Sequence, residues 1–531
     1  MDSKSIDHLG LVAGMFDEIN IKEIIDKHIL QDMDQRNISI GECVKAMILN
    51  GLGFVNSQLY LVPDFLDKKP IEKLFGRELK TSFFNDDVLG RALDDLYSND
   101  ICQLFTKIST SACKKLGLKD QTYHLDSTSF HTHGDHVNNN PEDENVIELV
   151  KGYSRDHHPE LNQAILEMIV SNKSGIPLAM KPLSGNKNDS KEFPKIIKSF
   201  VKNLEYTEIE PITFVADCAL YTEKNIAELP DDLKFITRVP ERIKELKEHY
   251  SRLNINQLTA INKDYSYTEV TSNYGDKEQR WIILFSKPSQ RRKTKTYDKN
   301  LKKKINSESK KIGDLSRKDF ACEKDLQKDI QKLKKKLKYL IIRDIEVEKH
   351  KKYLKKGRPG KNAKSTIYYR PKIQYSENKN FIEEEKSKLG LFTLSTNHLD
   401  DYTAAEILKL YKDQGKVERG FRFLKDNTFI ASSLYLEKPQ RIEALMFVMS
   451  ICLMVYSALE YRIRKELKDR DLTFKSQVKK DVQNPTTKWI FYNFIGIHIL
   501  YLDGEFKILN KQRKHRKILR ILGQIYKSYY S

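Results

Sequence analysis

The stretch Tyr411–Lys425, YKDQGKVERGFRFLK, places charged and apolar residues at helical spacing. Tyr411, Glu418 and Lys425 follow one another at intervals of seven, so on one continuous helix they would share a stripe. A neighbouring apolar face, which predicts docking on a core, consists of Val417, Phe421 and Leu424. A carboxylate held between a phenol and an ammonium beside a buried face can present a metal ligand. The plainer interpretation of this window alone is an amphipathic surface helix with ordinary charges.

Two segments upstream each predict a strand that ends in an aspartate. The segment 121–129, QTYHLDSTS, alternates apolar residues and ends in an acidic and hydroxylic cluster at Asp126. The segment 211–217, PITFVAD, is almost continuously apolar and ends in Asp217. Between them we predict a hairpin turning at 172–175 and a helix that begins at Asp189 or Ser190. This order predicts an α/β fold with a mixed sheet covered by helices.

The three carboxylates Asp126, Asp217 and Glu418 form the candidate site. A single aspartate at a strand end is more often a turn or cap residue. Here the predicted order is strand, hairpin, helix, strand, strand, helix, with the two aspartates at strand ends and Glu418 on the last helix. This order predicts that the three carboxylates converge on one site. Such a site can hold two divalent cations about 4 Å apart, one activating a water or 3′-hydroxyl and one stabilising the leaving oxygen at phosphorus. Hard oxygen ligands favour Mg²⁺ or Mn²⁺ over zinc.

The bulk composition points to a polyanionic partner and a reducing compartment. The 531-residue chain has a formal charge of +19, which favours nucleic acid as partner. Its six cysteines are scattered without a CxxC pair, which argues against zinc ribbons and a disulfide framework and for the cytoplasm. The most apolar run, 444–459, is interrupted by polar residues and shorter than a bilayer requires, so we expect a buried helix and no membrane association.

The composition changes along the chain and predicts five parts. They are an N-terminal helical domain (1–120), a first part of the catalytic core (121–220), a basic α+β insertion (221–390), a second part of the core (391–465) and a basic C-terminal region (466–531). Capping signals at Ser39–Glu42, Asn85 and Thr403–Glu406 mark expected helix starts. For the N-terminal domain, the sequence favours DNA-end recognition and a helical packing role, such as dimerisation, equally.

The insertion carries the strongest charge run. It contains a basic tract at 291–311, a helix predicted from Leu326, Ile330, Leu333, Leu337 and Leu340, and a basic loop at 351–364. A charge run is usually a solvated face, but the concentration of lysine in one insertion makes phosphate contact equally plausible.

The motifs around the three carboxylates resemble those of DDE transposases of prokaryotic insertion sequences. The matching segments are YHLDSTSFHTHG (123–134), GYSRDHHPELNQ (152–163), VADCALYTEKN (215–225), YKDQGKVERGFRFLKD (411–426), RIEALMFV (441–448) and NPTTKWIFYNFIGIH (484–498). The chain is similar to the group marked by a Tyr-x2-Arg-x3-Glu-x6-Lys signature, whose positions fall within residues 411–425, and within that group to insertion-sequence family 1634. The resemblance implies an RNase H-like core split by an insertion, with Asp126, Asp217 and Glu418 as catalytic and metal-binding residues. It also implies two Mg²⁺ or Mn²⁺ ions, terminal inverted repeats and target DNA as partners, a homodimer on DNA, and a nucleoid-associated location.

One position departs from the signature. Gln414 stands where the arginine is expected, whereas Tyr411, Glu418 and Lys425 match. The resemblance implies that Tyr411 and Lys425 contact DNA rather than metal. Arg422, one turn from Glu418, is our candidate for a substitute phosphate contact.

Two other interpretations stay open at this point. His131-Thr-His133-Gly-Asp135-His136 fits the HxHxDH run of zinc-dependent metallohydrolases, follows a predicted strand and could recruit His157 or His158. Against it, the chain lacks that fold's repeated strand-rich halves. A non-catalytic DNA-binding protein would explain the charge but not the arrangement of carboxylates.

Overall fold

The computed structural model describes residues 2–54, 58–132, 146–154, 158–204, 212–353, 365–425, 436, 438–502 and 505–531. The chain forms two compact units. The first comprises residues 1–238, 272–280 and 395–531, and the second comprises residues 239–271 and 281–394. The finer division into five parts remains a prediction.

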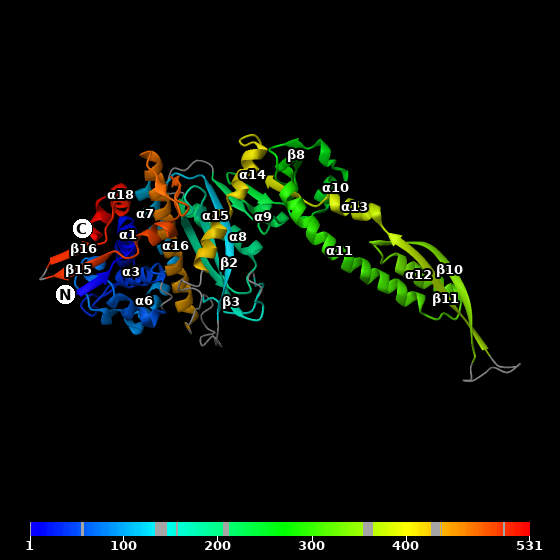
Figure 1. Cartoon of the computed structure of the whole chain (residues 1–531), viewed down its shortest axis with the longest axis horizontal. Coiled ribbons are helices and arrows are strands. Elements are labelled where there is room, and N and C mark those ends of the chain that lie inside the picture. Colours follow the sequence, from blue (N-terminus) through cyan, green and yellow to red (C-terminus); the bar gives the residue numbers. More distant parts are fainter. Residues whose placement is uncertain are drawn as a thin grey trace. The chain divides into compact units, whose positions relative to one another are not determined.

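The first unit contains a mixed sheet in the strand order β4-β3-β2-β5-β6. Its strands are β2 (Thr122–Thr132), β3 (Asn162–Ser171), β4 (Pro177–Ser184), β5 (Thr213–Ala216) and β6 (Lys234–Arg238). Strands β2, β3 and β4 are antiparallel, whereas β5 runs parallel to β2 and β6 parallel to β5. Helices α8 (Asp189–Leu204) and α9 (Glu223–Glu228) connect the parallel strands. The predicted RNase H-like α/β architecture is confirmed (Figure 1).

The β3–β4 hairpin forms where the sequence predicts it. The turn contains Gly175 at φ +71°, a left-handed conformation that favours glycine. Strand β3 is buried over almost its whole length, as expected for a strand covered on both faces.

Asp126 is not at the end of its strand, which corrects the sequence-based expectation. It lies in the middle of the 11-residue strand β2, opposite Met168 of β3. The hydroxylic residues after it continue the ladder to Thr132 because both β3 and the covering helices bury them. The polar run therefore belongs to the strand and does not mark its end.

Short helices make up the N-terminal region. They are α1 (Leu9–Glu18), α2 (Ile21–His28), α3 (Ile40–Gly51), α4 (Val62–Asp67), α5 (Ile71–Phe75), α6 (Asp86–Tyr97) and α7 (Ile101–Leu116). The predicted capping box of Ser39 and Glu42 begins α3, and the Asn85 side chain accepts the Val88 N–H at 2.9 Å to begin α6. These caps are confirmed.

The C-terminal third returns to the same unit. It contains α14 (Ala404–Lys412), α15 (Gly415–Leu424), α16 (Pro439–Asp469), α17 (Thr487–Phe494), α18 (Arg513–Leu522) and α19 (Gln524–Tyr529). Its strands are β13 (Phe474–Lys475), β14 (Asp481–Val482), β15 (His498–Leu502) and β16 (Glu505–Leu509), and β15 pairs with the N-terminal β1 (Asp2–Ser5).

Helix α16 is the central helix of the unit. Within the described residues it alone is long and apolar enough to cross a bilayer, and 89% of its most apolar window is buried inside the protein. Burial of this degree is typical of a core helix, as the sequence predicts.

The second unit combines strands with a long helix. Its elements are α10 (Lys244–Arg252), β7 (Thr259–Ala260), β8 (Tyr265–Ser272), β9 (Gln279–Ser286), α11 (Lys287–Ser316), α12 (Glu323–Lys334), β10 (Leu340–Tyr353), β11 (Ser365–Glu377), α13 (Lys379–Ser387) and β12 (Leu391–Thr396). Strands β12, β9, β8 and β7 are neighbours in that order, and β10 and β11 form a separate hairpin.

Helix α12 is shorter than the sequence predicts. It ends at Lys334, and Leu340 already belongs to β10. The buried carboxylate of Glu308 accepts the N–H groups of Lys338, Tyr339 and Leu340, each at 3.0 Å. These bonds hold the chain in a non-helical course, so the leucine spacing does not continue as helix. Residues 354–364 of the predicted basic loop lie outside the described residues.

Candidate active site

Three charged residues lie in a row across the parallel strands. Leu125 of β2 is in register with Ala216 of β5, and Ala216 with Thr237 of β6. One residue further along each strand come Asp126, Asp217 and Arg238. Since neighbouring strands lie about 4.8 Å apart, the backbones of the two aspartates are separated by roughly that distance.

Backbone donors orient both carboxylates. The Ser127 N–H donates to Asp126 Oδ1 at 2.8 Å, and the Ala219 N–H donates to Asp217 Oδ1 at 2.8 Å. The Thr237 hydroxyl donates to the Asp217 carbonyl at 2.7 Å, which ties the residue after β5 to β6. Both aspartates are half-buried, at the boundary between core and solvent.

Tyr411, Glu418 and Lys425 do not share one continuous helix. Helix α14 ends at Lys412 and α15 begins at Gly415, while Lys425 is the C-cap of α15. At the junction the Lys416 N–H bonds to the Asp413 carbonyl and the Val417 N–H to the Gln414 carbonyl, both three residues back. Aspartate and glycine are weak helix formers, and the tighter turn interrupts the stripe.

Helix α15 nevertheless lies along the face of β2 that carries Asp126. Lys416 Nζ donates to the Asn172 carbonyl at 2.6 Å, next to the turn of the β3–β4 hairpin. At the other end, Lys425 Nζ lies 5.9 Å from the ring centroid of Phe130. Phe130 is four residues beyond Asp126 and therefore points to the same face. As predicted, an apolar face docks the helix, because Val417, Phe421 and Leu424 are buried.

The charged residues of the site affect the pKa of Tyr411. Burial, the largest cause, together with the negative charges of Asp217 and Glu418 raises the pKa of Tyr411 to about 12, while Arg238 opposes this shift. The phenol therefore remains a neutral hydrogen-bond donor at physiological pH. This coupling places Tyr411 with Asp217, Glu418 and Arg238 in one electrostatic neighbourhood.

The exposed side of α15 carries the remaining candidates. Glu418 and Arg422 are both exposed, and Glu418 lies in the first helical turn, where the helix dipole stabilises a carboxylate. Gln414 is only 8% exposed, so its side chain contributes to the α14–α15 junction rather than to the surface.

Sequence reasoning missed Arg238. FITRV resembles any other buried strand with a polar end, and the motifs quoted above do not include it. Its position as the last residue of the third parallel strand is the signal that could have identified it, because parallel strands bring their carboxyl ends to one edge of the sheet.

The three candidate carboxylates suit a hard divalent cation, but the structure does not hold them together in the arrangement of a metal site. In the part of the chain that the structure describes, no three His, Cys, Asp or Glu residues are placed to hold one metal ion. Like charges repel, and three carboxylates gain by closing together only around cations. Carboxylate oxygens are the ligands that Mg²⁺ and Mn²⁺ prefer, so Asp126, Asp217 and Glu418 fit such ions by chemistry.

The zinc interpretation gains no support from the described residues. His131 lies at the end of β2 and, five residues from Asp126, points to the opposite face. Its ring lies 5.6 Å from that of His158, whose Nδ1 is 3.0 Å from Glu160. The other members of the run, His133, Asp135 and His136, and also His157, lie outside the described residues.

Two known protein families match most of the chain. Residues 118–455 match the family described as "Transposase DDE domain", and residues 1–110 match a domain of unknown function, DUF4277. No curated protein sequence matches significantly. Among solved structures, a cryo-EM structure of the piggyBac transposase synaptic complex with hairpin DNA is similar, with a TM-score of 0.40 and 10% identity over 91% of this chain and 78% of that chain.

The transposase match includes both aspartates, Tyr411, Glu418 and the strands and helices that position them. Enzymes of this family use divalent metal ions, in agreement with the carboxylate donor set. The chain belongs to the transposase DDE domain family and is a DDE transposase, an enzyme of DNA transposition.

Proposed function

We propose that this transposase mobilises a prokaryotic insertion sequence of the Tyr-Arg-Glu-Lys group, similar to family 1634. It would cleave DNA at the ends of its element and transfer the freed 3′ ends into target DNA. The observation that carries the proposal is the register of Asp126 beside Asp217, with Tyr411 coupled electrostatically to both Asp217 and Glu418.

Asp126, Asp217 and Glu418 would hold two Mg²⁺ or Mn²⁺ ions. When bound, such ions lower the pKa of a bound water and neutralise charge at the phosphorus. The chain's own residues position the substrate: the neutral Tyr411 hydroxyl donates a hydrogen bond to a phosphate oxygen, and Lys425 and Arg422 supply positive charge along α15. Arg238 offsets the charge of Asp217, which favours approach of a polyanionic strand.

The partners follow from the same chemistry. Terminal inverted repeats and target DNA would both be bound, and acting on two ends at once implies a homodimer in the DNA complex. The net charge of +19 favours association with the nucleoid in the cytoplasm.

The test is a cleavage assay on a duplex that carries the element's own end sequence. With Mg²⁺ or Mn²⁺ present, Asp126→Asn, Asp217→Asn and Glu418→Gln should each reduce cleavage about 10³-fold or more while DNA binding persists. Asp231→Asn is the matched control, because the Asp231 side chain is 99% exposed in an ion pair with Lys277. Normal cleavage by the three variants, together with loss of cleavage in His131→Ala, would refute the proposal in favour of the zinc interpretation.

A further inference from the structure

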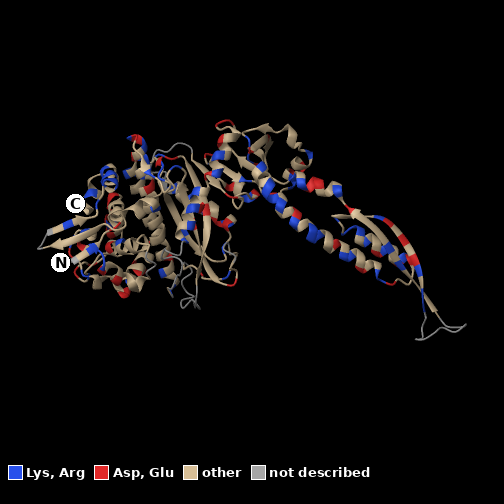
Figure 2. Ribbon diagram, viewed as in Figure 1, with Lys and Arg blue, Asp and Glu red and all other residues tan. Residues whose placement is uncertain are grey.

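The solvent-facing side of α11 is a continuous basic surface. Figure 2 shows lysines and arginines along this helix. Its exposed basic residues are Arg291, Arg292, Lys295, Lys299, Lys302, Lys303, Lys304, Lys310 and Lys311. Arg291, Arg292, Lys295 and Lys299 recur at one-turn spacing and therefore share one side of the helix, which we call the α11 basic face.

Packing on the opposite side fixes the orientation of this face. Ile312 is 1% exposed and forms a core cluster with Leu333 and Leu340, against which Ile305 and Leu315 also pack. Glu308 points to the same interior side, where it accepts the three backbone N–H groups before β10. Rotating α11 to hide its basic face would expose these apolar residues, so the charges stay in solvent.

Acidic residues on α11 do not neutralise the face. Asp298 is bonded to Lys386 at 2.8 Å, Glu308 is buried, and Asp314 bonds to Arg317 at 2.7 Å near the end of the helix. None of Arg291, Arg292, Lys295 and Lys299 forms an ion pair with another described residue. An ordinary exposed helix such as α10 interleaves both signs, as its Lys244–Glu248 pair shows.

We propose that the α11 basic face binds the sugar-phosphate backbone of duplex DNA. From Arg291 to Lys299 the helix spans roughly 12 Å. Successive phosphates on one strand of duplex DNA advance about 3.4 Å along the helix axis, so the face is about as long as three or four nucleotides of one strand. Lysine and arginine contacts of this kind carry no base information, and binding here is independent of sequence. The inference rests on the proposed function, since it assigns part of the DNA partner to one surface.

The experiment compares two variants of the full-length protein with equal loss of charge. The test variant is Arg291→Gln, Arg292→Gln, Lys295→Gln and Lys299→Gln. The control variant is Arg242→Gln, Lys244→Gln, Lys247→Gln and Arg252→Gln, which removes two arginines and two lysines from exposed positions in and beside α10. The dissociation constant is measured at several salt concentrations for an unrelated duplex and for the element's own end.

We expect the test variant to bind both duplexes at least about 10-fold more weakly near physiological salt. The slope of log affinity against log salt concentration should fall in magnitude by about 3 to 4. Each lost phosphate contact reduces this slope by about 0.9, and the variant removes four basic side chains. The control should keep the wild-type slope. An equal loss of DNA affinity in both variants would mean that only the net charge matters. Unchanged affinity in the test variant would mean that α11 does not contact DNA. Either result overturns the inference.

The binding measurement does not depend on catalysis, and a second measurement tests whether α11 prefers another polyanion. A wild-type protein that binds through α11 but does not cleave would count against the proposed function alone. Vesicles of phosphatidylglycerol and phosphatidylcholine provide the second arm. Binding of α11 to these vesicles in place of DNA would refute the inference.

Discussion

At the residue scale, the protonation state of buried groups decides what they can do. Burial and the charges of Asp217 and Glu418 raise the pKa of Tyr411 from 10 to about 12, so the phenol keeps its proton well into the alkaline range. A phenolate in this place would add negative charge beside the carboxylates. The neutral hydroxyl can instead donate to a phosphate oxygen, which is the role that the signature predicts for it.

His8, which precedes α1 in the N-terminal helical region, shows the opposite shift. Burial lowers the pKa of His8 from 6.5 to about 4, against the hydrogen bond to the Leu52 carbonyl and the charge of Asp7. Its Nε2–H donates to the Leu52 carbonyl at 2.7 Å and its ring stacks on Phe491 at 4.3 Å. The buried Nδ1 has no hydrogen-bond partner among the described residues, so protonation would create an unpaired buried cation.

This shift predicts a loss of stability in acid that depends on His8. The unfolded chain binds the proton at the ordinary pKa of 6.5 and the folded chain only near 4, so stability present above pH 6.5 falls as the pH decreases towards 4. The loss should reach roughly 3 kcal/mol. Denaturant unfolding at several pH values should show this loss in the wild type and a shallower one in His8→Gln. Parallel curves for the two proteins would contradict the assignment.

At the element scale, the placement of Glu418 depends on how α15 packs against α16. A Cβ atom on Gly420 would lie 3.1 Å from Leu453 Cδ2, closer than ordinary packing allows. Leu453 belongs to the buried side of α16 and is 2% exposed. The absence of a side chain at Gly420 thus lets the two helices approach, and α15 carries Glu418 only two residues away.

We predict that Gly420→Val displaces α15 and reduces cleavage. Overpacking at such a contact costs about 1–3 kcal/mol, and the shift would move Glu418 away from the aspartates. Gly415→Val is the matched control, because a Cβ atom on Gly415 would meet only Arg419 Nη1, at 4.0 Å. Both variants place a β-branched residue in the same helix, so the cost to helix formation is common to them. Thermal unfolding and the cleavage rate should both change in Gly420→Val and stay close to wild type in Gly415→Val. Equal effects in the two variants would show that the Leu453 contact is unimportant.

At the scale of the whole molecule, the C-terminal end of the chain completes the N-terminal helical region. Cβ atoms on Gly10 and Gly14 of α1 would lie 2.7 Å from the rings of Tyr530 and Tyr526, so these rings rest directly on the helix. The Tyr530 hydroxyl donates to the Asp7 carbonyl at 2.7 Å.

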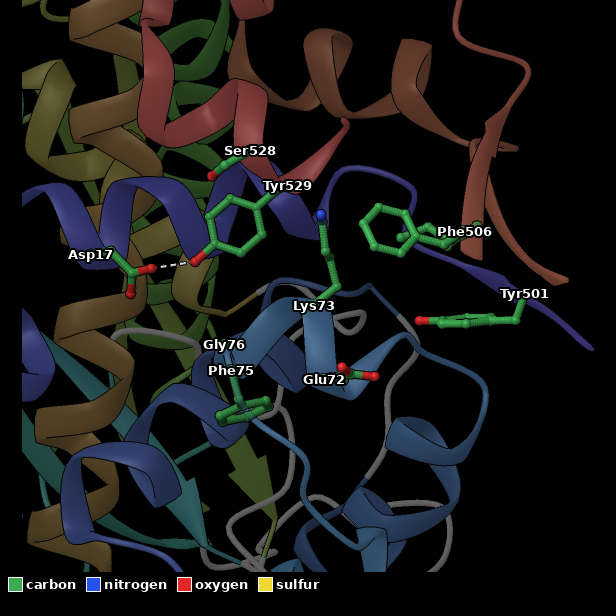
Figure 3. Close-up of a pocket in the computed structure, with 10 residues that line it drawn as sticks. Asp17, Glu72, Lys73, Phe75, Gly76, Tyr501, Phe506, Ser528 and Tyr529 are labelled. Atoms are coloured by element: carbon green, nitrogen blue, oxygen red, sulfur yellow. Dashed lines mark hydrogen bonds between the residues drawn. The ribbon is translucent and has the colours of Figure 1, made fainter. Parts of the chain in front are cut away.

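A cavity of ≈ 410 Å³ adjoins this contact, where α5, β15, β16 and α19 meet. Figure 3 shows Tyr529 bonded to Asp17 and the Lys73 side chain beside Phe506, whose ring centroid is 4.1 Å from the Lys73 ammonium. None of the three candidate carboxylates lines the cavity, so it plays no part in the proposed chemistry.

Removal of one C-terminal ring should therefore destabilise the N-terminal helices. Tyr530 is fully buried, and its replacement in Tyr530→Ala should cost ~3–5 kcal/mol through lost packing and the empty volume left behind. Tyr492→Ala, at a side chain 63% exposed, is the control and should be nearly neutral. Hydrogen exchange followed peptide by peptide should show faster exchange in α1 for Tyr530→Ala alone. Unchanged protection of α1 would mean that the C-terminal end is dispensable for this region.

Local signals in the sequence determined much of the fold. The caps at Ser39, Asn85 and Thr403, the hairpin turn at Gly175 and Asp217 at the end of β5 lie where the sequence predicts them. Each depends on a few consecutive residues whose hydrogen bonds or backbone preferences are fixed by their own chemistry. The same holds for α16, whose apolar length demands burial.

The tertiary structure decided the features that depend on residues distant in the chain. Pairing with β3 extended β2 past Asp126, and the carboxylate of Glu308 ended α12 before Leu340. Register across three strands placed Arg238 beside Asp217, and the contact of α19 with α1 joined the two ends of the chain. The sequence alone therefore determined the catalytic class and the local elements, because these are encoded in short motifs. Only the fold could decide which charges meet, because strand pairing and helix packing bring together side chains that no local pattern connects.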